Sequence, residues 1–256
     1  MGTTKLYQTE WNNISLVEVS KQINKSVKDI ADKDFYRAFY QKLNENNWIL
    51  QNDFLEEKRS LGEAVFNVLK PKVDDTIISL GAGLGICEIS AIGGGYNVEL
   101  QEVQPDSFMY LEKIDVVPKK KWVTYDLTDM PENFYDYVII NHVLYCFDDK
   151  QYIDYLMKVN RLLKSGGKVI ITGELLSESE CLKMIISNNK GLRKILGKDN
   201  SRVFWGYLRT VRRHKKLLSK IFNVCECGQL FYGDRKLDYS FFLCGKKKHI
   251  PIGSEK

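Results

Sequence analysis

The sequence predicts an α/β protein with a mostly parallel sheet and helices on both faces. From about residue 75, short runs rich in valine, isoleucine and aromatic residues alternate with helix-like segments. These runs are continuously apolar, as in strands that are buried on both sides. Two further apolar runs close the chain and predict an antiparallel hairpin at one edge of the sheet.

The expected elements follow in order along the chain. Five runs are expected to form parallel strands, at 76–80, 98–103, 122–125, 137–140 and 168–172. Helices are expected between them, at 86–91, 107–113 and 151–163. The hairpin is expected over 223–231 and 237–244, after a helix near 215–222.

Two further helices are expected ahead of the first strand. Aromatic and leucine residues at spacings of three and four predict one helix over 33–43. A second is expected from near Phe54 to Leu69, with Asp53 as its N-cap and Pro71 marking its end. We therefore expect three parts, namely a helical cap segment at 1–52, a main domain at 53–248 with an insertion at about 177–214, and a flexible tail at 249–256.

Composition excludes several classes of protein. The chain has 256 residues and a net charge of +5, with 44% hydrophobic and 28% charged residues. These values exclude a mainly disordered or fibrous chain. The mild basic excess suits a small anionic substrate and falls short of that of a dedicated nucleic-acid binder. Six scattered cysteines without a C-x-x-C pair, and no apolar run of membrane-spanning length, predict a cytoplasmic protein with no disulfide, metal site or membrane span.

A glycine-rich loop follows the first expected strand and opens a short helix. It reads Gly81-Ala82-Gly83-Leu84-Gly85. Glycines let the backbone turn tightly and let a ligand approach without meeting Cβ atoms. The G-x-G-x-G spacing differs from the dinucleotide fingerprint, which disfavours a nicotinamide-dependent oxidoreductase, and the Lys-Ser/Thr of a P-loop is absent. A mere strand-to-helix turn would not need three glycines.

Polar residues stand where the next three strands end. Glu102 lies at the end of the second strand, Asp126 follows the third, and Asn141 and His142 end the fourth. Open α/β sheets bind ligands at the carboxyl ends of parallel strands. A carboxylate at Glu102 can accept both hydroxyls of a ribose, and Asp126 with a backbone N–H can contact an adenine edge.

The run from Ser79 to Thr172 resembles the core of the class I S-adenosylmethionine-dependent methyltransferases. The motifs of that family are similar, in order, to 80–85, 101–107, 126–131, 136–144 and 162–168. The resemblance implies a Rossmann-like seven-stranded sheet whose last two strands form the hairpin, with S-adenosyl-L-methionine as cofactor. Two positions depart from the family: Ser79 replaces an acidic residue that helps to hold the methionine amino group, and Cys146 replaces a histidine.

The resemblance also implies which residues hold the cofactor. Arg59, on the helix before the first strand, is a candidate for the methionine carboxylate, although it could equally lie on a solvated helix face. The other expected cofactor-binding residues are Ser79, Gly81, Ala82, Gly83, Gly85, Glu102, Val103, Asp126, Leu127 and Asn141.

Methyl transfer to a hydroxyl or amine needs alignment and a base. His142, at the end of the fourth strand, is the candidate base, or else a cofactor contact or helix cap. Tyr145 is the candidate for orienting the acceptor. His214 is expected on an exposed helix without a role, and His249 lies in the tail.

The acceptor is expected to contact the cap segment and the insertion. An aromatic and cationic pocket would suit a sugar or a phosphorylated small molecule, such as a nucleotide-activated sugar or a surface-polysaccharide building block. Each of these side chains could instead serve packing or lie on the surface. The candidates are Tyr36, Arg37, Tyr40, Trp205, Tyr207 and Arg209.

The leading interpretation is an O-methyltransferase acting on a small, anionic acceptor. RNA or protein methylation is the second interpretation, although the fourth strand lacks the proline-aromatic motif of base amino-methylating relatives. A catalytically silent partner subunit is the third. The sequence indicates neither the oligomeric state nor the acceptor.

Overall fold

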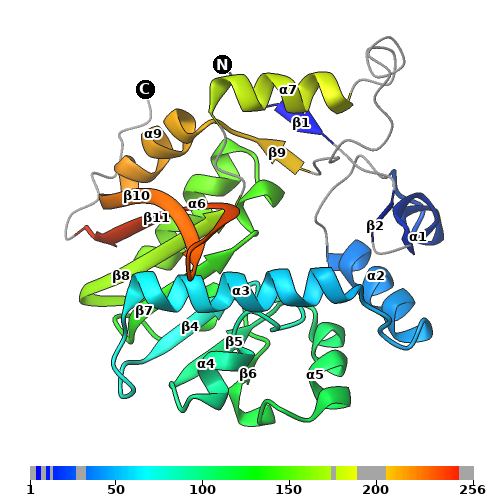
Figure 1. The fold of residues 1–256 in the computed structure, drawn as a ribbon, viewed down its shortest axis with the longest axis horizontal. Helices are drawn as coiled ribbons and strands as arrows, with labels where there is room; N and C mark the ends of the chain where they lie inside the picture. Colours follow the sequence, from blue (N-terminus) through cyan, green and yellow to red (C-terminus); the bar gives the residue numbers. More distant parts are fainter. Residues whose placement is uncertain are drawn as a thin grey trace.

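The computed structural model describes residues 4–6, 10–11, 14–26, 33–173, 177–188 and 206–247. Its centre is a seven-stranded sheet in the order β10-β11-β8-β7-β4-β5-β6 (Figure 1). The neighbouring strands β8, β7, β4, β5 and β6 run parallel to one another. At the β8 edge, β11 and β10 add an antiparallel hairpin. This confirms the predicted fold class. The strands are β4 (Ile77–Leu80), β5 (Val98–Gln101), β6 (Trp122–Val123), β7 (Tyr135–Asn141), β8 (Leu163–Gly173), β10 (Phe222–Tyr232) and β11 (Arg235–Lys246).

Apolar side chains cover both faces of the sheet. Ile77 and Ile139 belong to one buried cluster, and their neighbours Ile78 and Ile140 belong to another. Successive strand residues point to opposite faces, so a strand buried on both sides must be apolar throughout.

Helices from different parts of the chain complete the two clusters. The first cluster contains residues of α1 (Leu16–Gln22), α2 (Lys33–Glu45), α3 (Asn52–Leu69), α4 (Ile89–Gly93) and α5 (Met109–Ile114). The second contains residues of α6 (Asp149–Leu162) and α9 (Val211–Ile221). Short 3-10 turns lie at η1 (Pro105–Phe108), η2 (Lys119–Lys121), η3 (Leu127–Asp129) and η4 (Leu144–Cys146).

The helix α3 begins before the predicted N-cap. Gln51 occupies the N-cap position without a side-chain hydrogen bond, and Asp53 lies in the first turn. The assignment of Asp53 as N-cap is therefore wrong, although its charge still favours the positive end of the helix dipole. The helix ends at Leu69, where Lys70 turns left-handed just before Pro71.

The N-terminal segments lie against the main fold. Thr4–Leu6 (β1) pairs antiparallel with Gly206–Leu208 (β9), and Glu10–Trp11 (β2) pairs with Ile14–Ser15 (β3). Phe35, Phe39 and Leu43 of α2 are buried, as the helical spacing predicts. Because they share a cluster with α3 and the sheet, the cap segment and the domain core are packed together.

Parts of the predicted organisation fall outside this description. The insertion is described at α7 (Glu178–Asn188) and from residue 206 onward, and residues 189–205 and the tail 249–256 lie outside the described residues. The proposed division into three parts stays a prediction. Among the described helices, none combines the length and apolarity that a bilayer span needs. No cluster of three or more metal-ligating side chains occurs within the described ranges.

Two helical glycines provide a matched test of how tightly α3 packs. A Cβ at Gly62 would lie 1.7 Å from the carbonyl oxygen of Cys87, whereas a Cβ at Gly93 would meet no atom within 4 Å. Gly62→Ala should therefore destabilise the protein by about 2 kcal/mol or more, because a backbone must move. Gly93→Ala should be neutral or stabilising by up to about 1 kcal/mol.

Chemical denaturation of both variants measures this difference. Equal stability of Gly62→Ala and wild type would contradict the close approach of α3 to the segment that precedes α4.

Candidate active site

A cavity of about 950 Å³ opens at the carboxyl ends of β4, β5 and β7. The strand order reverses between β4 and β7, which is where open α/β sheets bind ligands. Of the residues expected at the site, those that line the cavity are Tyr36, Tyr40, Gly81, Ala82, Gly83, Glu102, Val103, Asp126, Leu127, Asn141, His142, Tyr145, Tyr207 and Arg209. Ser79, Gly85, Arg37 and Arg59 are not among the lining residues, and Trp205 lies outside the described residues.

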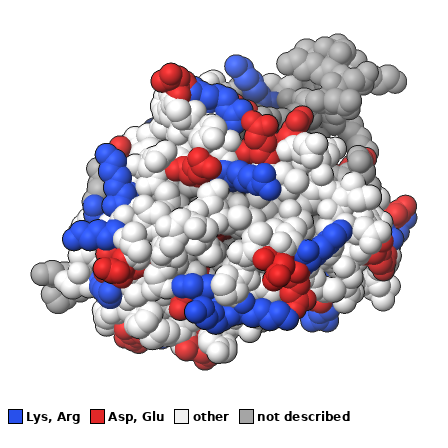
Figure 2. Space-filling view, turned by 60° about the horizontal axis from the view of Figure 1, so that its bottom comes forward, with Lys and Arg blue, Asp and Glu red and all other residues white. Residues whose placement is uncertain are grey.

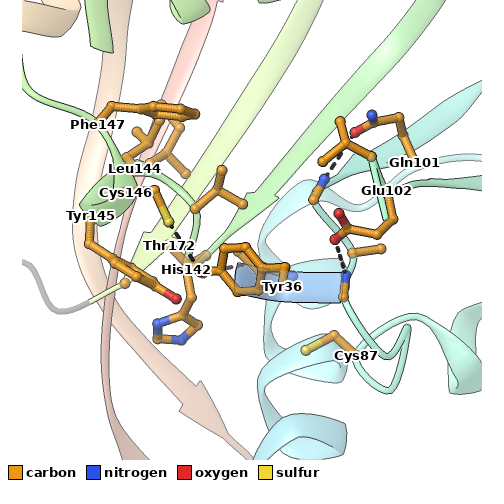
Figure 3. A pocket seen from close by; sticks show the side chains of 18 of the residues that line it. Tyr36, Cys87, Gln101, Glu102, His142, Leu144, Tyr145, Cys146, Phe147 and Thr172 are labelled. Carbon is orange, nitrogen blue, oxygen red and sulfur yellow. Dashed lines mark hydrogen bonds between the residues drawn. The ribbon is translucent and has the colours of Figure 1, made fainter. Parts of the chain in front are cut away.

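The glycine loop is held by side chains of the neighbouring strand. The Gly81 N–H donates to Gln101 Oε1 at 3.2 Å, and the Gly83 N–H donates to Glu102 Oε2 at 3.1 Å (Figure 3). Gly81 has φ +64°, and a Cβ there would lie 2.7 Å from Val143. Gly85 has φ +66° and faces Leu100 and Leu111 instead, so its role is packing. Gly81 and Gly83 thus present backbone without a side chain to the cavity, held by two hydrogen bonds from their N–H groups.

Glu102 is the buried carboxylate beside this loop. Besides Gly83, it accepts a hydrogen bond from the Gln104 N–H at 3.2 Å. Burial raises the pKa of its carboxyl, and the bonds from Gln104 and Gly83 act in the opposite direction. These two N–H groups fix the carboxylate in place. Each oxygen has a second lone pair that a ligand hydroxyl can reach.

Asp126 and Leu127 lie on the same wall, after β6. The Asp126 carboxylate accepts from the Thr128 N–H at 3.0 Å, which lowers the pKa of the group. Lys158 stands 3.4 Å from the same oxygen. Leu127 is buried and supplies an apolar surface.

Glu88 lines the cavity, whereas Ser79, which the sequence predicted at the site, does not. Ser79 is fully buried, and its hydroxyl donates to Glu88 Oε1 at 2.7 Å. Asn141 Nδ2 lies 3.4 Å from the same oxygen. Glu88 Oε2 is buried and has no hydrogen-bond partner within the described ranges, and burial raises the pKa of the carboxyl to about 7. The cavity therefore has an acidic group at this end, supplied from the turn before α4 rather than from β4.

The signal for Glu88 in the sequence is slight. It is the one charged residue in the run Ile86–Ile92, in which apolar residues predominate. The sequence predicts a helix over 86–91, and no local pattern indicates where the Glu88 carboxylate lies.

His142 occupies the end of β7 in a left-handed conformation, with φ +53°. Its ring meets the edge of Tyr239, with centroids 4.6 Å apart. Its Nε2 is buried, and no residue in the described part of the chain forms a hydrogen bond with it. Burial, with a smaller contribution from Lys58, holds the pKa of the imidazole well below its ordinary value. The ring is therefore neutral at pH 7, and its nitrogen without a proton can accept a hydrogen bond from a ligand. A non-glycine residue held at this φ carries backbone strain, which is typical of functional positions.

Tyrosines of α2 cover the cavity. Figure 3 shows Tyr36 between the Glu102 side of the cavity and the side formed by His142 and Tyr145. The Tyr36 hydroxyl lies 3.5 Å from Cys146 Sγ, and the Tyr36 and Tyr40 rings stack at 6.1 Å. Burial raises the pKa values of Tyr36, Tyr40 and Tyr145, and raises that of the Cys146 thiol to about 12. These groups stay protonated at neutral pH.

Arg209 lines the cavity but is occupied by the protein itself. Its side chain is fully buried, and its Nε donates to Asp149 Oδ1 at 2.8 Å. Its other nitrogens donate to the carbonyl oxygens of Leu144, Phe147 and Tyr207. The expectation that Arg209 meets the acceptor is therefore corrected: its guanidinium holds the η4 turn.

The two other predicted arginines lie away from the cavity. Arg37 is half exposed and stands 3.4 Å from Asp34. Arg59 is exposed, and its neighbour Lys58 lines the cavity instead. Successive residues of a helix are rotated by about 100°, so Arg59 points away from the face of α3 on which Lys58 meets the cavity. Lys58 Nζ lies 5.3 Å from the Tyr239 ring centroid and 5.6 Å from that of Phe54. Within the described part of the chain, no carboxylate forms an ion pair with it.

His214 is buried rather than exposed. Its Nδ1 lies 2.9 Å from the Tyr152 hydroxyl, and burial lowers the pKa of the ring to about 3. The spacing of His214 with Leu217, Leu218 and Ile221 places it on the buried face of α9. This periodicity could have corrected the prediction of an exposed histidine.

A scan against protein-family models and a search of curated proteins give no match. Solved structures do match. Magnesium protoporphyrin IX methyltransferase from Synechocystis PCC 6803, with bound SAH, is 13% identical over 85% of this chain and 100% of its own, with a TM-score of 0.56. The 1,6-didemethyltoxoflavin-N1-methyltransferase of Burkholderia thailandensis is 13% identical over 86% and 92%, with a TM-score of 0.54. A SAM-dependent methyltransferase from Aquifex aeolicus is 11% identical over 81% and 98%, also with a TM-score of 0.54.

These likenesses extend over most of both chains in each comparison. The strand order of this chain, with an antiparallel hairpin at the edge of the sheet, is the one that the sequence resemblance implies. The chain has the fold of the class I S-adenosylmethionine-dependent methyltransferases.

Proposed function

We propose that this protein transfers a methyl group from S-adenosyl-L-methionine to a hydroxyl oxygen of a small acceptor. The observation that carries this proposal is the arrangement of Glu102, the glycine loop and His142 around one cavity at the switch point of the sheet. The solved structures that share the fold were crystallised with SAH or named as SAM-dependent enzymes, which supports the same cofactor here.

The cavity fits this cofactor from end to end. Glu102 can accept both ribose hydroxyls while Gly83 holds it in place. Asp126 and Leu127 provide a carboxylate and an apolar surface for the adenine. The glycine loop leaves room for the backbone to approach the ligand.

The amino-acid end of the cofactor would meet Glu88 and Lys58. It carries an ammonium and a carboxylate, and the cavity presents one buried carboxylate and one lysine there. The unpartnered Oε2 of Glu88 suits the ammonium. Lys58 suits the carboxylate and takes the role predicted for Arg59. Charge-assisted hydrogen bonds of this kind are the strong ones in proteins.

His142 would act as the general base. When bound, the cofactor would supply a sulfonium-activated methyl group, and attack of the acceptor oxygen on the methyl carbon would form the C–O bond and leave the C–S electron pair on sulfur. The acceptor hydroxyl would give its proton to Nε2, which is buried and has no hydrogen-bond partner among the described residues. Tyr145 lies near the ring and can orient the acceptor (Figure 3).

The anionic character of the acceptor stays a prediction, and so does a link to polysaccharide building blocks. Arg37 and Arg209, the two cationic residues predicted to meet such an acceptor, have carboxylate partners within the chain. Nucleic acid remains the less favoured substrate. Figure 2 shows lysine and arginine interspersed with acidic residues on the face in view, without the extended basic patch that nucleic-acid binding needs.

Glu102→Gln should weaken binding of S-adenosylhomocysteine by about tenfold or more, because a charged acceptor of ribose hydrogen bonds is lost. Isothermal titration calorimetry of both proteins, with NAD as the control ligand, measures this. Wild-type protein should bind S-adenosylhomocysteine and not NAD. Failure of the wild type to bind S-adenosylhomocysteine would overturn the proposed function.

Glu88→Gln and Lys58→Met should each weaken S-adenosylhomocysteine binding by about tenfold. Binding of 5′-methylthioadenosine, which lacks the amino-acid end, should stay unchanged. Arg59→Met is the matched control on the same helix and should change neither. If Arg59→Met weakens binding and Lys58→Met does not, the assignment of Lys58 is wrong.

The same site predicts a pH dependence. The Glu88 carboxyl has a raised pKa of about 7, and an ammonium binds to its ionised form. Affinity for S-adenosylhomocysteine should therefore fall as the pH is lowered below 7, approaching about tenfold per pH unit for one linked proton. Glu88→Gln should flatten this profile between pH 5.5 and 8. A wild-type profile as flat as that of the variant would remove Glu88 from the site.

His142→Asn should reduce turnover by about 100-fold or more, the contribution typical of a general base. Asparagine tolerates the left-handed conformation, so the fold and the affinity for S-adenosylhomocysteine should persist. Turnover is measured with an acceptor that the wild-type protein methylates. Retention of turnover would show that His142 is not the base.

A further inference from the structure

We propose that the acceptor is an uncharged, planar aromatic compound with a hydroxyl group, that is, a phenol-type molecule. This inference rests on the proposed methyl transfer and concerns the part of the cavity beyond the cofactor residues. It departs from the expectation of a sugar or a phosphorylated acceptor.

The first argument is the aromatic wall, which we define as Trp11, Phe39, Phe54 and Tyr239. All four line the cavity, and they come from β2, α2, α3 and β11. Trp11 lies 5.1 Å from Phe39 and 5.1 Å from Phe54, between ring centroids. Tyr239 contacts His142 at 4.6 Å. Aromatic rings gain energy from stacking or edge contacts with another ring, beyond the area they bury.

The wall leads to the proposed base. Lys58 lies over both Phe54 and Tyr239, so it bridges the two parts of the wall. From Tyr239 the next ring is His142, whose Nε2 has no hydrogen-bond partner. A ring that packs against the wall can therefore present its hydroxyl to Nε2.

The second argument is that two polar groups expected to meet a sugar or a phosphorylated acceptor are occupied within the chain. The Tyr36 hydroxyl is paired with Cys146, and Arg209 is paired with Asp149. A sugar carries many hydroxyls, and a site that buries it must satisfy each of them. A phenol needs a partner for one hydroxyl only, and the Nε2 of His142 can supply it.

The third argument is charge. Among the described residues that line the cavity, three are cationic and five are acidic, so the lining opposes a further negative group. Lys158 and Arg209 have carboxylate partners, and Lys58 is assigned to the cofactor. A phosphoryl or carboxylate group on the acceptor would be buried here without a counter-ion, which is costly.

The test uses the full chain saturated with S-adenosylhomocysteine and three matched probes. We compare 2-naphthol with decahydro-2-naphthol, which is not planar, and with 6-hydroxy-2-naphthoate, which is anionic. In calorimetry at pH 7, 2-naphthol should bind at least about fivefold more tightly than decahydro-2-naphthol. It should bind at least about tenfold more tightly than 6-hydroxy-2-naphthoate. Glucose 1-phosphate should not bind.

Two tryptophan variants distinguish a contact between the acceptor and the aromatic wall from a general loss of stability. Trp11→Leu should weaken 2-naphthol binding about fivefold or more while leaving S-adenosylhomocysteine affinity unchanged. Trp122→Leu, on β6 and stacked on Phe108 away from the cavity, should change neither. If Trp11→Leu does not fold, Phe54→Leu makes the same comparison.

The outcomes are distinct. If S-adenosylhomocysteine binds but 2-naphthol does not, or if 6-hydroxy-2-naphthoate or glucose 1-phosphate binds more tightly, the inference on the acceptor is wrong and the proposed cofactor stands. If S-adenosylhomocysteine itself does not bind, the proposed function fails first.

Discussion

The burial of both faces of the central sheet is the constraint on which the rest of this structure depends. Ile77 and Ile78 are adjacent in the chain, yet they belong to different clusters on opposite faces. A sheet of this kind needs helices on both sides, and its parallel strands need crossover helices to connect them. The polar side chains that line the cavity stand mainly where these strands end. The cavity lies at one of these ends because the chain reverses its strand order between β4 and β7.

This constraint also explains why the site residues come from short segments. Glu102 directly follows β5, His142 directly follows β7, and the glycine loop directly follows β4. Each is fixed by a strand that is itself immobilised by packing. The hydrogen bonds from the loop to Gln101 and Glu102 then join two of these segments into one wall.

Local sequence was sufficient to predict which residues at the ends of strands line the cavity. The glycine loop, Glu102, Asp126 and His142 were all predicted, because a strand end and a residue type specify where such a group lies. Helical and long-range placements were harder. The error at Arg59 is one of helix phase, since Lys58 is only one residue away.

The other misplacements depend on contacts between distant segments. Arg209 is held by Asp149, which is 60 residues away in the chain. Glu88 reaches its position through Ser79 on β4. His214 could have been placed from the apolar periodicity of α9, but its Tyr152 partner could not. No local pattern records these partners, because they arise only when the sheet and its helices have assembled.

The position of α2 has a consequence for the kinetics of ligand exchange. Tyr36 and Tyr40 lie over the cavity, while Phe35, Phe39 and Leu43 of the same helix are buried in the main cluster. For a ligand that leaves past α2, displacing the helix would expose these apolar side chains to water, so the local stability of α2 would set a barrier to release. A substitution that loosens the buried side of α2 would then shorten the residence time of the ligand as it lowers the free energy of unfolding.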